Sequence, residues 1–578
     1  MASHETSSTS SFSAEDFDLA LSELEASKQE WAELAVEERI KILQDMKDAL
    51  AAVAEDWAMT AARHKQIPED SALEGEEWLS GPYAMMCGLN ALIETLSQLD
   101  YKVFVKRLKT RSLGSGQLAV RLLPVTFKDE MALPDVKAEV WMQGHVTEGN
   151  LRNYAASVYD IAPKDRKGRI ALVLGAGNIA SIAPLDVLHK LISEHQVVIL
   201  KMNPINDYLT DYLKAAMKPL IDRGFLRIVC GAADAGTYLC DHLLVEEIHI
   251  TGAAATHDAI VWGVGNEARQ NRAADTPRTT KRVTSELGGI SPTIVVPGPW
   301  SDADVKFQAE HMASQKLHNS GHNCIACQAL LLPKDWEKTE QLMREIKAIA
   351  KTHSRPAYYP GSQQRMDAFK QTANSVVAIN RIESAPPLLI GELGDQDWGM
   401  DNECFAPALA TKTFDAADVE SYLRTAIAYA NKKLAGTLGA NILIHPQTLR
   451  DIGKENFEAI ISELHYGTIA INTWCGLAFN ALSCPWGAFP GHTLQDIQSG
   501  IGTVHNTLML EDTERVVIQG PWRPFPRSIL NGEMTMFPRP PYFITHKTQR
   551  ALGKLLTRFQ HRPSLLQLPG IFINALRG

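Results

Sequence analysis

Short apolar runs and helical polar–apolar segments alternate through the middle of the chain. The runs have the length and composition of buried strands, and the segments between them have helical spacing. The expected strands are residues 170–174, 197–200, 226–229 and 248–250, and the expected helices are residues 183–193 and 207–217. Strands that alternate with helices of about ten residues predict βαβ units and a parallel sheet.

Two further regions flank this block. A second α/β block follows Glu286, with expected strands at residues 291–296, 329–332, 439–444 and 468–472 and expected helices at 336–352 and 420–431. Ahead of the first block we expect helices over residues 13–62 and 83–110, then extended pieces at 118–123 and 136–142. Ser13 precedes the acidic Asp16 by three residues, which is typical of a helix start. The fold class is therefore α/β.

Length and composition narrow the class of protein. The chain has 578 residues, enough for roughly three to five domains. Hydrophobic residues make up 45% and charged residues 21%, which is typical of a soluble globular protein and excludes a mainly disordered chain. We find no apolar run long enough to span a membrane. The net charge of −10 argues against a nucleic-acid partner.

Cysteine usage and the first residues bear on the compartment. Eight cysteines in this length do not make a disulfide scaffold, so we expect reduced thiols and a cytoplasmic protein. Residues 1–12 lack the basic and apolar regions of a signal peptide and are expected to form a disordered tail. No second cysteine pair has metal-ligand spacing, so no metal site is expected.

The sequence GAGNIA at residues 175–180 follows an expected strand and opens an expected helix. It fits the glycine-rich loop that binds dinucleotides. The acidic residue that should end the next strand is missing, since that strand ends in Lys201-Met-Asn203. A nucleotide loop and a tight structural turn therefore remain open from this segment alone.

Several other short motifs are individually ambiguous. Glu286 precedes two glycines and could be a surface residue before a turn. Cys324 and Cys327 could form a redox pair or lie in the core. His257, His318 and His322 could be catalytic bases, although structural histidines are the more common case.

Taken in order, these motifs resemble the aldehyde dehydrogenase superfamily from the N-terminal helices to about residue 505. SELGG at 285–289 is similar to its E-L-G-G motif and GHNC at 321–324 to G-Q-x-C. ECFAP at 403–407 is similar to E-x-F-G-P and GTIAIN at 467–472 to G-x-v-x-x-N. Residues 485–502 resemble P-F-G-G…S-G-x-G with an insertion, and Asn178 precedes Lys201 by 23 residues, as a functional asparagine and lysine do in the family.

The resemblance implies a fold and a division into domains. It implies a Rossmann-like cofactor domain, an α/β catalytic domain and a β-hairpin that forms oligomers. We expect a tail at 1–12, an NAD(P)-binding domain at 13–115 and 146–285, and the hairpin at 116–145. The catalytic domain is expected at 286–484, a return to the cofactor and oligomerisation region at 485–533, and a C-terminal extension at 534–578.

The resemblance also implies roles for seven residues in oxidising an aldehyde to an acid with NAD or NADP. Cys324 would attack the aldehyde, the Asn178 amide would stabilise the oxyanion, and Glu286 would activate water to release the acid. Lys201, Glu403 and Phe405 would contact the cofactor, and the helix that follows Gly252 would bind its diphosphate.

Two rival functions remain open. A CoA-acylating or acyl-reducing relative would pass the thioester to a thiol or reduce it; Glu286 argues against this, because such enzymes need no water-activating base. A catalytically silent nucleotide-binding relative is the other rival, against which the joint presence of Asn178, Glu286 and Cys324 argues. Ala253 and His257 depart from the family pattern around the cofactor, and Ala176-Gly177 replaces the usual Pro-Trp.

Cofactor choice and assembly can also be predicted from the resemblance. Pro204 stands where NAD-preferring members often have a glutamate, so NADP should be at least tolerated. The family's hairpin forms domain-swapped dimers, which predicts a homodimer or a tetramer made of two dimers. A proline turn at 133–135 separates the two extended pieces of the expected hairpin.

The C-terminal residues differ in charge from the rest of the chain. Beyond Glu533 there are seven basic residues and no acidic one. Residues 548–562 have the pattern of a basic amphipathic helix, which Pro563 would end. This helix could pack across a dimer against the acidic body, lie on an anionic membrane surface as a peripheral contact, or cover the substrate tunnel.

Overall fold

The computed structural model describes most of the chain. The described residues are 13–125, 133, 135–382, 385–394, 397–524, 527–530, 532–533 and 539–578. The expected N-terminal tail, at 1–12, lies outside them, and so does Pro134 of the expected hairpin turn.

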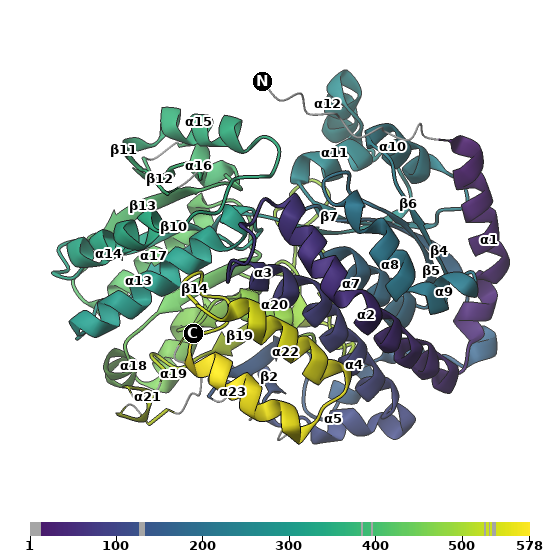
Figure 1. The fold of residues 1–578 in the computed structure, drawn as a ribbon, viewed down its shortest axis with the longest axis horizontal. Coiled ribbons are helices and arrows are strands. Elements are labelled where there is room, and N and C mark those ends of the chain that lie inside the picture. Colours follow the sequence, from purple (N-terminus) through teal and green to yellow (C-terminus); the bar gives the residue numbers. More distant parts are fainter. Residues whose placement is uncertain are drawn as a thin grey trace.

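Among the described residues, six strands form the smaller of two large sheets (Figure 1). In spatial order they are β17 (Gly500–Ile501), β8 (Arg282–Leu287), β7 (Glu247–Gly252), β4 (Arg169–Leu174), β5 (Gln196–Lys201) and β6 (Leu226–Val229). All neighbours pair in parallel except β17, which is antiparallel to β8. Every residue of β5 is buried, as expected for a parallel strand that helices cover on both faces. The predicted βαβ block is therefore confirmed.

Helices cover both faces of this sheet. They are α1 (Ala14–Glu33), α2 (Val36–His64), α7 (Ile182–Leu188), α8 (Thr210–Ala216), α9 (Lys218–Asp222), α10 (Ala233–Asp241), α11 (Ala254–Trp262) and α12 (Gly265–Ala274). The start of α1 follows from local chemistry, because the Ser13 hydroxyl accepts a hydrogen bond from the Asp16 amide at 3.3 Å.

Eleven described strands form the second sheet. In spatial order they are β1 (Thr110–Ser112), β2 (Leu118–Leu123), β3 (Lys137–Met142), β19 (Thr513–Gln519), β15 (Thr468–Ile471), β14 (Gly439–Leu443), β9 (Ser291–Val295), β10 (Cys327–Pro333), β13 (Ala408–Phe414), β12 (Leu388–Glu392) and β11 (Asn374–Ile379). A separate antiparallel pair joins β16 (Pro485–Trp486) to β18 (Val504–His505). Because Glu286 lies on β8, the chain crosses from the small sheet to the large one after Leu287.

The large sheet also has helices on both faces. They are α13 (Asp302–Leu317), α14 (Thr339–Lys351), α15 (Ser362–Thr372), α16 (Trp398–Asp401), α17 (Val419–Lys433), α18 (Pro446–Ile452) and α19 (Lys454–Ser462). Successive residues of β10 alternate between the two faces. Leu331 packs in the cluster that includes α17 and α19, whereas Leu330 and Leu332 pack with α13 and α14.

The predicted hairpin continues the large sheet within the same chain. β2 and β3 are antiparallel, β3 pairs with β19, and β19 pairs in parallel with β15. The remaining shorter α-helices are α3 (Glu74–Trp78), α4 (Ala84–Leu96), α5 (Val103–Arg107), α20 (Gly476–Asn480) and α21 (Arg527–Leu530). The oligomeric state expected from the hairpin stays a prediction.

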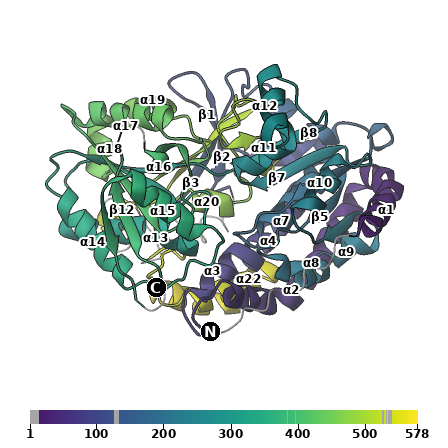
Figure 2. The ribbon, with the colours of Figure 1, turned by 90° about the horizontal axis from the view of Figure 1, so that it is seen from above.

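The C-terminal extension folds onto the body of its own chain. Its main helix, α22 (Gln549–His561), matches the predicted segment, and a second helix, α23 (Leu568–Leu576), follows. In Figure 2 α22 lies beside α2 and α3. Basic residues of the extension meet acidic side chains of the body: Arg550 of α22 pairs with Glu74 at 2.8 Å, and Arg562, just after this helix, pairs with Asp48 at 3.0 Å.

Between the two helices of the extension, Leu565 and Leu566 are 80% and 91% exposed. Within the described part of the chain, no helix combines the length and apolar character that crossing a membrane requires. The expected peripheral membrane contact stays a prediction.

Candidate active site

A strained turn at the end of α13 presents Cys324. Asn319, Ser320 and Gly321 all have positive φ, at 51°, 55° and 81°. Left-handed backbone costs a non-glycine residue about 1–3 kcal/mol and clusters at functional sites. Glycine is required at 321, because a Cβ there would lie 2.7 Å from the carbonyl oxygen of Ala406. Cys324 follows, half-buried, at the wall of a large cavity.

Glu286 faces this cysteine from the small sheet. It lies near the end of β8 with 4% of its surface exposed. Its Oε1 accepts a hydrogen bond from the Trp486 indole at 3.1 Å. Its carboxyl group is close enough to the Cys324 thiol for each to influence the pKa of the other, while the thiol donates to Oδ1 of Asn323 at 3.7 Å. Burial, with the nearby Asp186 carboxylate, raises the pKa of Glu286 to about 8. The carboxyl group therefore exchanges protons close to neutral pH, as a general base requires.

Burial also raises the pKa of the Cys324 thiol well above its usual range, and the Glu286 and Glu403 carboxylates add to this effect. A thiol is a weak nucleophile compared with its thiolate. The reactive form of Cys324 thus depends on a neighbour that accepts its proton, and Glu286 is in position to do so.

Asn178 reaches the nucleophile turn from the other side. Its side-chain amide donates to the His322 carbonyl at 3.2 Å, two residues before Cys324. Its backbone carbonyl accepts from Lys65 at 2.8 Å, Asn319 at 3.1 Å and Tyr358 at 3.2 Å. Three donors to one carbonyl hold this residue against the turn.

The glycine turn that carries Asn178 is filled by protein. A Cβ on Gly177 would lie 2.8 Å from Oδ1 of Asn203, and Asn206 donates to the Ala176 carbonyl at 3.0 Å. Because side chains occupy the position that a phosphate would take, this turn does not have the form of a diphosphate loop. Of the two interpretations left open by the sequence, the structural turn fits.

The start of α11, beyond Gly252, is a second place where an anion could bind. This glycine ends β7, and α11 starts at Ala254 with no side-chain cap from Ala253. Residues 252–256 are exposed. The free amides of a helix N-terminus favour negative charge, so the cofactor's diphosphate fits here. Lys201, at the end of β5, which β4 separates from β7, is buried, and this lowers the pKa of its ammonium group.

Glu403 and Phe405 lie just before β13 of the large sheet, and the Glu403 carboxyl group is near enough to Cys324 to act on it electrostatically. Burial raises the pKa of Glu403 to about 8, and its buried Oε1 has no hydrogen-bond partner within the described chain. Gly288 leaves room for the Glu403 carboxyl group, because a Cβ at position 288 would clash with it. Phe405 has a positive φ of 45°, and its ring packs edge-on against Tyr359. An unpaired acceptor beside a fixed ring fits a ribose hydroxyl and a nicotinamide.

The three candidate histidines and Cys327 are buried in the folded chain. Burial lowers the pKa of His318 to about 3 and that of His322 well below its usual range. His257 is fully buried, and its pKa is also lowered by burial. Cys327 is a free cysteine buried at the start of β10.

A buried ionic cluster lies behind Asn178 and was not expected from the sequence. Lys65 pairs with Glu77 at 2.8 Å, and Arg355 pairs with Glu77 at 3.1 Å and with Glu76. These side chains are at most 2% exposed. Arg355 is nearly 280 residues from its partners, so no local pattern could have revealed the cluster. Trp486 lies within a recognised motif, but its contact with Glu286 was not expected.

Comparisons with known proteins point to one family. The sequence model described as "Aldehyde dehydrogenase family" matches residues 197–489. Aldehyde dehydrogenase LUC3 from Fusarium sp is 26% identical over 30% of this chain and 34% of its own length. The dimeric NADP-preferring aldehyde dehydrogenase of Mus musculus is 23% identical over 42% of this chain and 52% of its own length. The chain thus spans about a third to a half of these curated relatives.

Solved structures share the fold over most of both chains. Aldehyde dehydrogenase C from Pseudomonas syringae, in complex with NAD+ and octanal, is 16% identical with a TM-score of 0.58, over 88% of this chain and 89% of that one. The NADP-dependent glyceraldehyde-3-phosphate dehydrogenase from Bacillus halodurans C-125, complexed with NADP, is 18% identical with a TM-score of 0.56, over 88% and 91%. The predicted fold class is confirmed.

Proposed function

Because the chain belongs to the aldehyde dehydrogenase family, we propose that it oxidises an aldehyde to a carboxylic acid, with NAD or NADP as electron acceptor. The observation that carries this proposal is that three groups lie close to the turn that presents Cys324, and Cys324 itself lines a large cavity. The Cys324 thiol, the Glu286 carboxyl group and the Asn178 amide come from three different elements and converge on the turn before β10.

The first step uses the contact between Glu286 and Cys324. The ionised Glu286 takes the thiol proton, and the sulfur attacks the aldehyde carbon to give a thiohemiacetal. Negative charge moves to the aldehyde oxygen, where the Asn178 amide can donate a hydrogen bond. Removing one such donor typically costs about 2.7–4 kcal/mol of transition-state stabilisation.

The residues present fit the cofactor that the family implies. The uncapped start of α11 suits a diphosphate, and the unpaired Oε1 of Glu403 suits a ribose hydroxyl. In this proposal Lys201 contacts the adenosine end of the cofactor and Phe405 contacts its nicotinamide end. A bound nicotinamide supplies the two-electron acceptor that converts the thiohemiacetal into a thioester.

Release of the acid returns to Glu286. Glu286 first passes the thiol proton to solvent and is again a carboxylate. It then takes a proton from water, the resulting hydroxide attacks the thioester carbon, and the carbon–sulfur bond breaks to release the acid and the Cys324 thiolate. The Trp486 indole fixes one carboxyl oxygen at 3.1 Å. The other oxygen is thereby oriented for proton transfer.

The proposal is tested with purified protein, a panel of aldehydes and both cofactors, by nicotinamide absorbance. Cys324→Ala should abolish turnover and leave cofactor binding nearly intact, whereas the neighbouring Cys327→Ala should keep most activity. Appreciable turnover in Cys324→Ala would show that the nucleophile is wrongly assigned. Added CoA that is consumed to form an acyl-CoA product would favour the CoA-acylating rival instead.

A further inference from the structure

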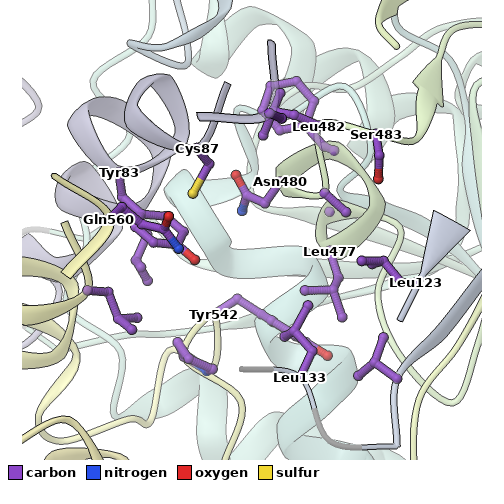
Figure 3. A pocket seen from close by; sticks show the side chains of 18 of the residues that line it. Tyr83, Cys87, Leu123, Leu133, Leu477, Asn480, Leu482, Ser483, Tyr542 and Gln560 are labelled. Atoms are coloured by element: carbon purple, nitrogen blue, oxygen red, sulfur yellow. The ribbon is translucent and has the colours of Figure 1, made fainter. Parts of the chain in front are cut away.

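A cavity of about 1200 Å³ runs from Cys324 to the C-terminal extension. Most small-molecule sites have about 300–1000 Å³, so this cavity is large for a short aldehyde. Its inner part is lined by Cys324 and by Leu477 of α20. Figure 3 shows three further residues around the same space: Tyr83, which precedes α4, Leu123 of the hairpin, and Gln560 of the C-terminal extension.

The outer wall belongs to the extension that follows the family motifs. Leu556 and Phe559 of α22 and Ile571 and Phe572 of α23 line the cavity. The C-terminal extension, which lies beyond the region that resembles other family members, therefore adds an apolar wall to the cavity that begins at Cys324.

The extension is fixed in place rather than loosely attached. A Cβ on Gly553 would lie 2.7 Å from Trp78, and a Cβ on Gly75 would lie 2.3 Å from the backbone of Gln549. These two glycines allow α22 and α3 to pack closely. Arg550 then pairs with Glu74 at 2.8 Å across the same contact. The helix is held as a wall of definite position.

The chemistry of the wall selects against charge. Its acidic and basic members are Glu94 and Arg107, which are exposed, and Lys47, which is half-buried. Gln560 accepts from Asn90 at 3.0 Å, and the buried Oδ1 of Asn480 has no partner within the described chain. A second charged group on a substrate would be buried without a partner, which is costly. An uncharged alkyl chain meets no such penalty.

We propose that the C-terminal extension determines chain length in this enzyme, and that its substrates are aldehydes with long, unbranched, uncharged chains. This rests on the proposed function, because it assumes that the aldehyde carbon is held at Cys324. The alkyl chain then fills the cavity toward α22 and α23. Each methylene that enters raises kcat/KM by up to about fourfold, until the chain reaches the wall.

The test compares kcat/KM for butanal, octanal and dodecanal in the full-length enzyme. We expect an increase of about a hundredfold or more from butanal to dodecanal. Leu556→Trp fills the outer cavity and should lower the ratio of dodecanal to butanal kcat/KM by about tenfold or more. Phe572→Ala enlarges it and should move the preferred chain to greater length. The matched control, Leu566→Trp, changes a leucine of the same extension that is 91% exposed and should keep the wild-type ratio.

Opposite shifts in two variants cannot come from a general loss of folding, which thermal unfolding of each variant checks. Titration of decanol into Cys324→Ala measures chain binding without turnover. If decanol binds but no aldehyde reduces either cofactor, the proposed function fails and the cavity assignment stands. If butanal is oxidised, kcat/KM does not rise with chain length and decanol does not bind, the proposal about the extension is wrong.

Discussion

At neutral pH most Glu286 side chains are protonated, because burial raises the pKa of this carboxyl group to about 8. Only the ionised form can take a proton from Cys324 or from water. The rate of acid release should therefore rise with pH through about 8 and then level. Glu286→Gln should remove this limb and slow release by about a hundredfold or more. Single-turnover measurements of acid release between about pH 6 and 10 would show this pH dependence. An unchanged pH profile in the variant would contradict the assignment.

The same shift affects stability. A glutamate in the unfolded chain has a pKa near 4.3, so folding holds an extra proton on Glu286 between that pH and about 8. This contribution to the free energy of unfolding is fully present below the unfolded pKa and is lost as pH rises through about 8. Urea unfolding of wild type and Glu286→Gln should differ in this pH window.

Pro204 should decide cofactor choice. It is exposed just beyond β5, three residues after Lys201. A carboxylate at this position would accept from a ribose 2′-hydroxyl and repel a 2′-phosphate. We expect Pro204→Glu to shift preference toward NAD, measured as the ratio of the two dissociation constants. A wild type that already binds NAD hundreds of times more tightly than NADP would contradict this prediction.

Among the elements, the loop that carries Asn178 depends on the residue just after α2. Lys65 is paired with Glu77 and donates to the Asn178 carbonyl. Lys65→Met leaves buried acidic groups short of a partner, which typically costs about 3–5 kcal/mol. We expect lower stability in urea unfolding, and a larger effect on kcat than on KM because the oxyanion donor loses its support. Lys41→Met, an exposed position on α2, should change stability by about 0.5 kcal/mol or less; equal losses in both variants would contradict the argument.

Elements whose signals are local could be predicted. The Ser13 cap, the apolar run of β4 and the periodicity of α22 each depend on residues a few positions apart. The pairing of β19 with β3 could not, because it joins segments hundreds of residues apart and leaves no periodic trace. In the candidate site the motifs located Cys324 and Glu286. The contacts that tune them, such as that with Trp486, depend on the folded chain.

At the scale of the whole molecule, the oligomeric state depends on which chain supplies the strand that pairs with the edge of β15. Here β19 of the same chain occupies this edge. A domain-swapped dimer would form the same pairing between two chains, which is the homo-oligomer that the resemblance predicts. Light scattering at micromolar concentration should give two or four times the mass of one chain. The mass of a single chain would show that the hairpin closes on its own sheet.

The C-terminal extension both packs against the body of the protein and lines the cavity at Cys324. Its basic side chains pair with α2 and α3, and its apolar side chains line the cavity that starts at Cys324. One segment thus contributes to both the packing of the body and the proposed selection of the substrate. This is why chain-length preference is expected to respond to residues far from Cys324 in the sequence.

The central claim is that Cys324 carries the acyl group and Glu286 releases it. Intact-protein mass spectrometry of Glu286→Gln, mixed with octanal and an oxidised nicotinamide cofactor, tests this most directly. We predict an adduct with the mass of an octanoyl thioester that forms slowly, because the variant also lacks the base for the thiol proton, but persists, because the attack of water is blocked. The adduct should map to the peptide containing Cys324 and disappear in the Cys324→Ala, Glu286→Gln double variant. An adduct on another residue, or cofactor reduction with no acyl-enzyme in Glu286→Gln, would contradict the account.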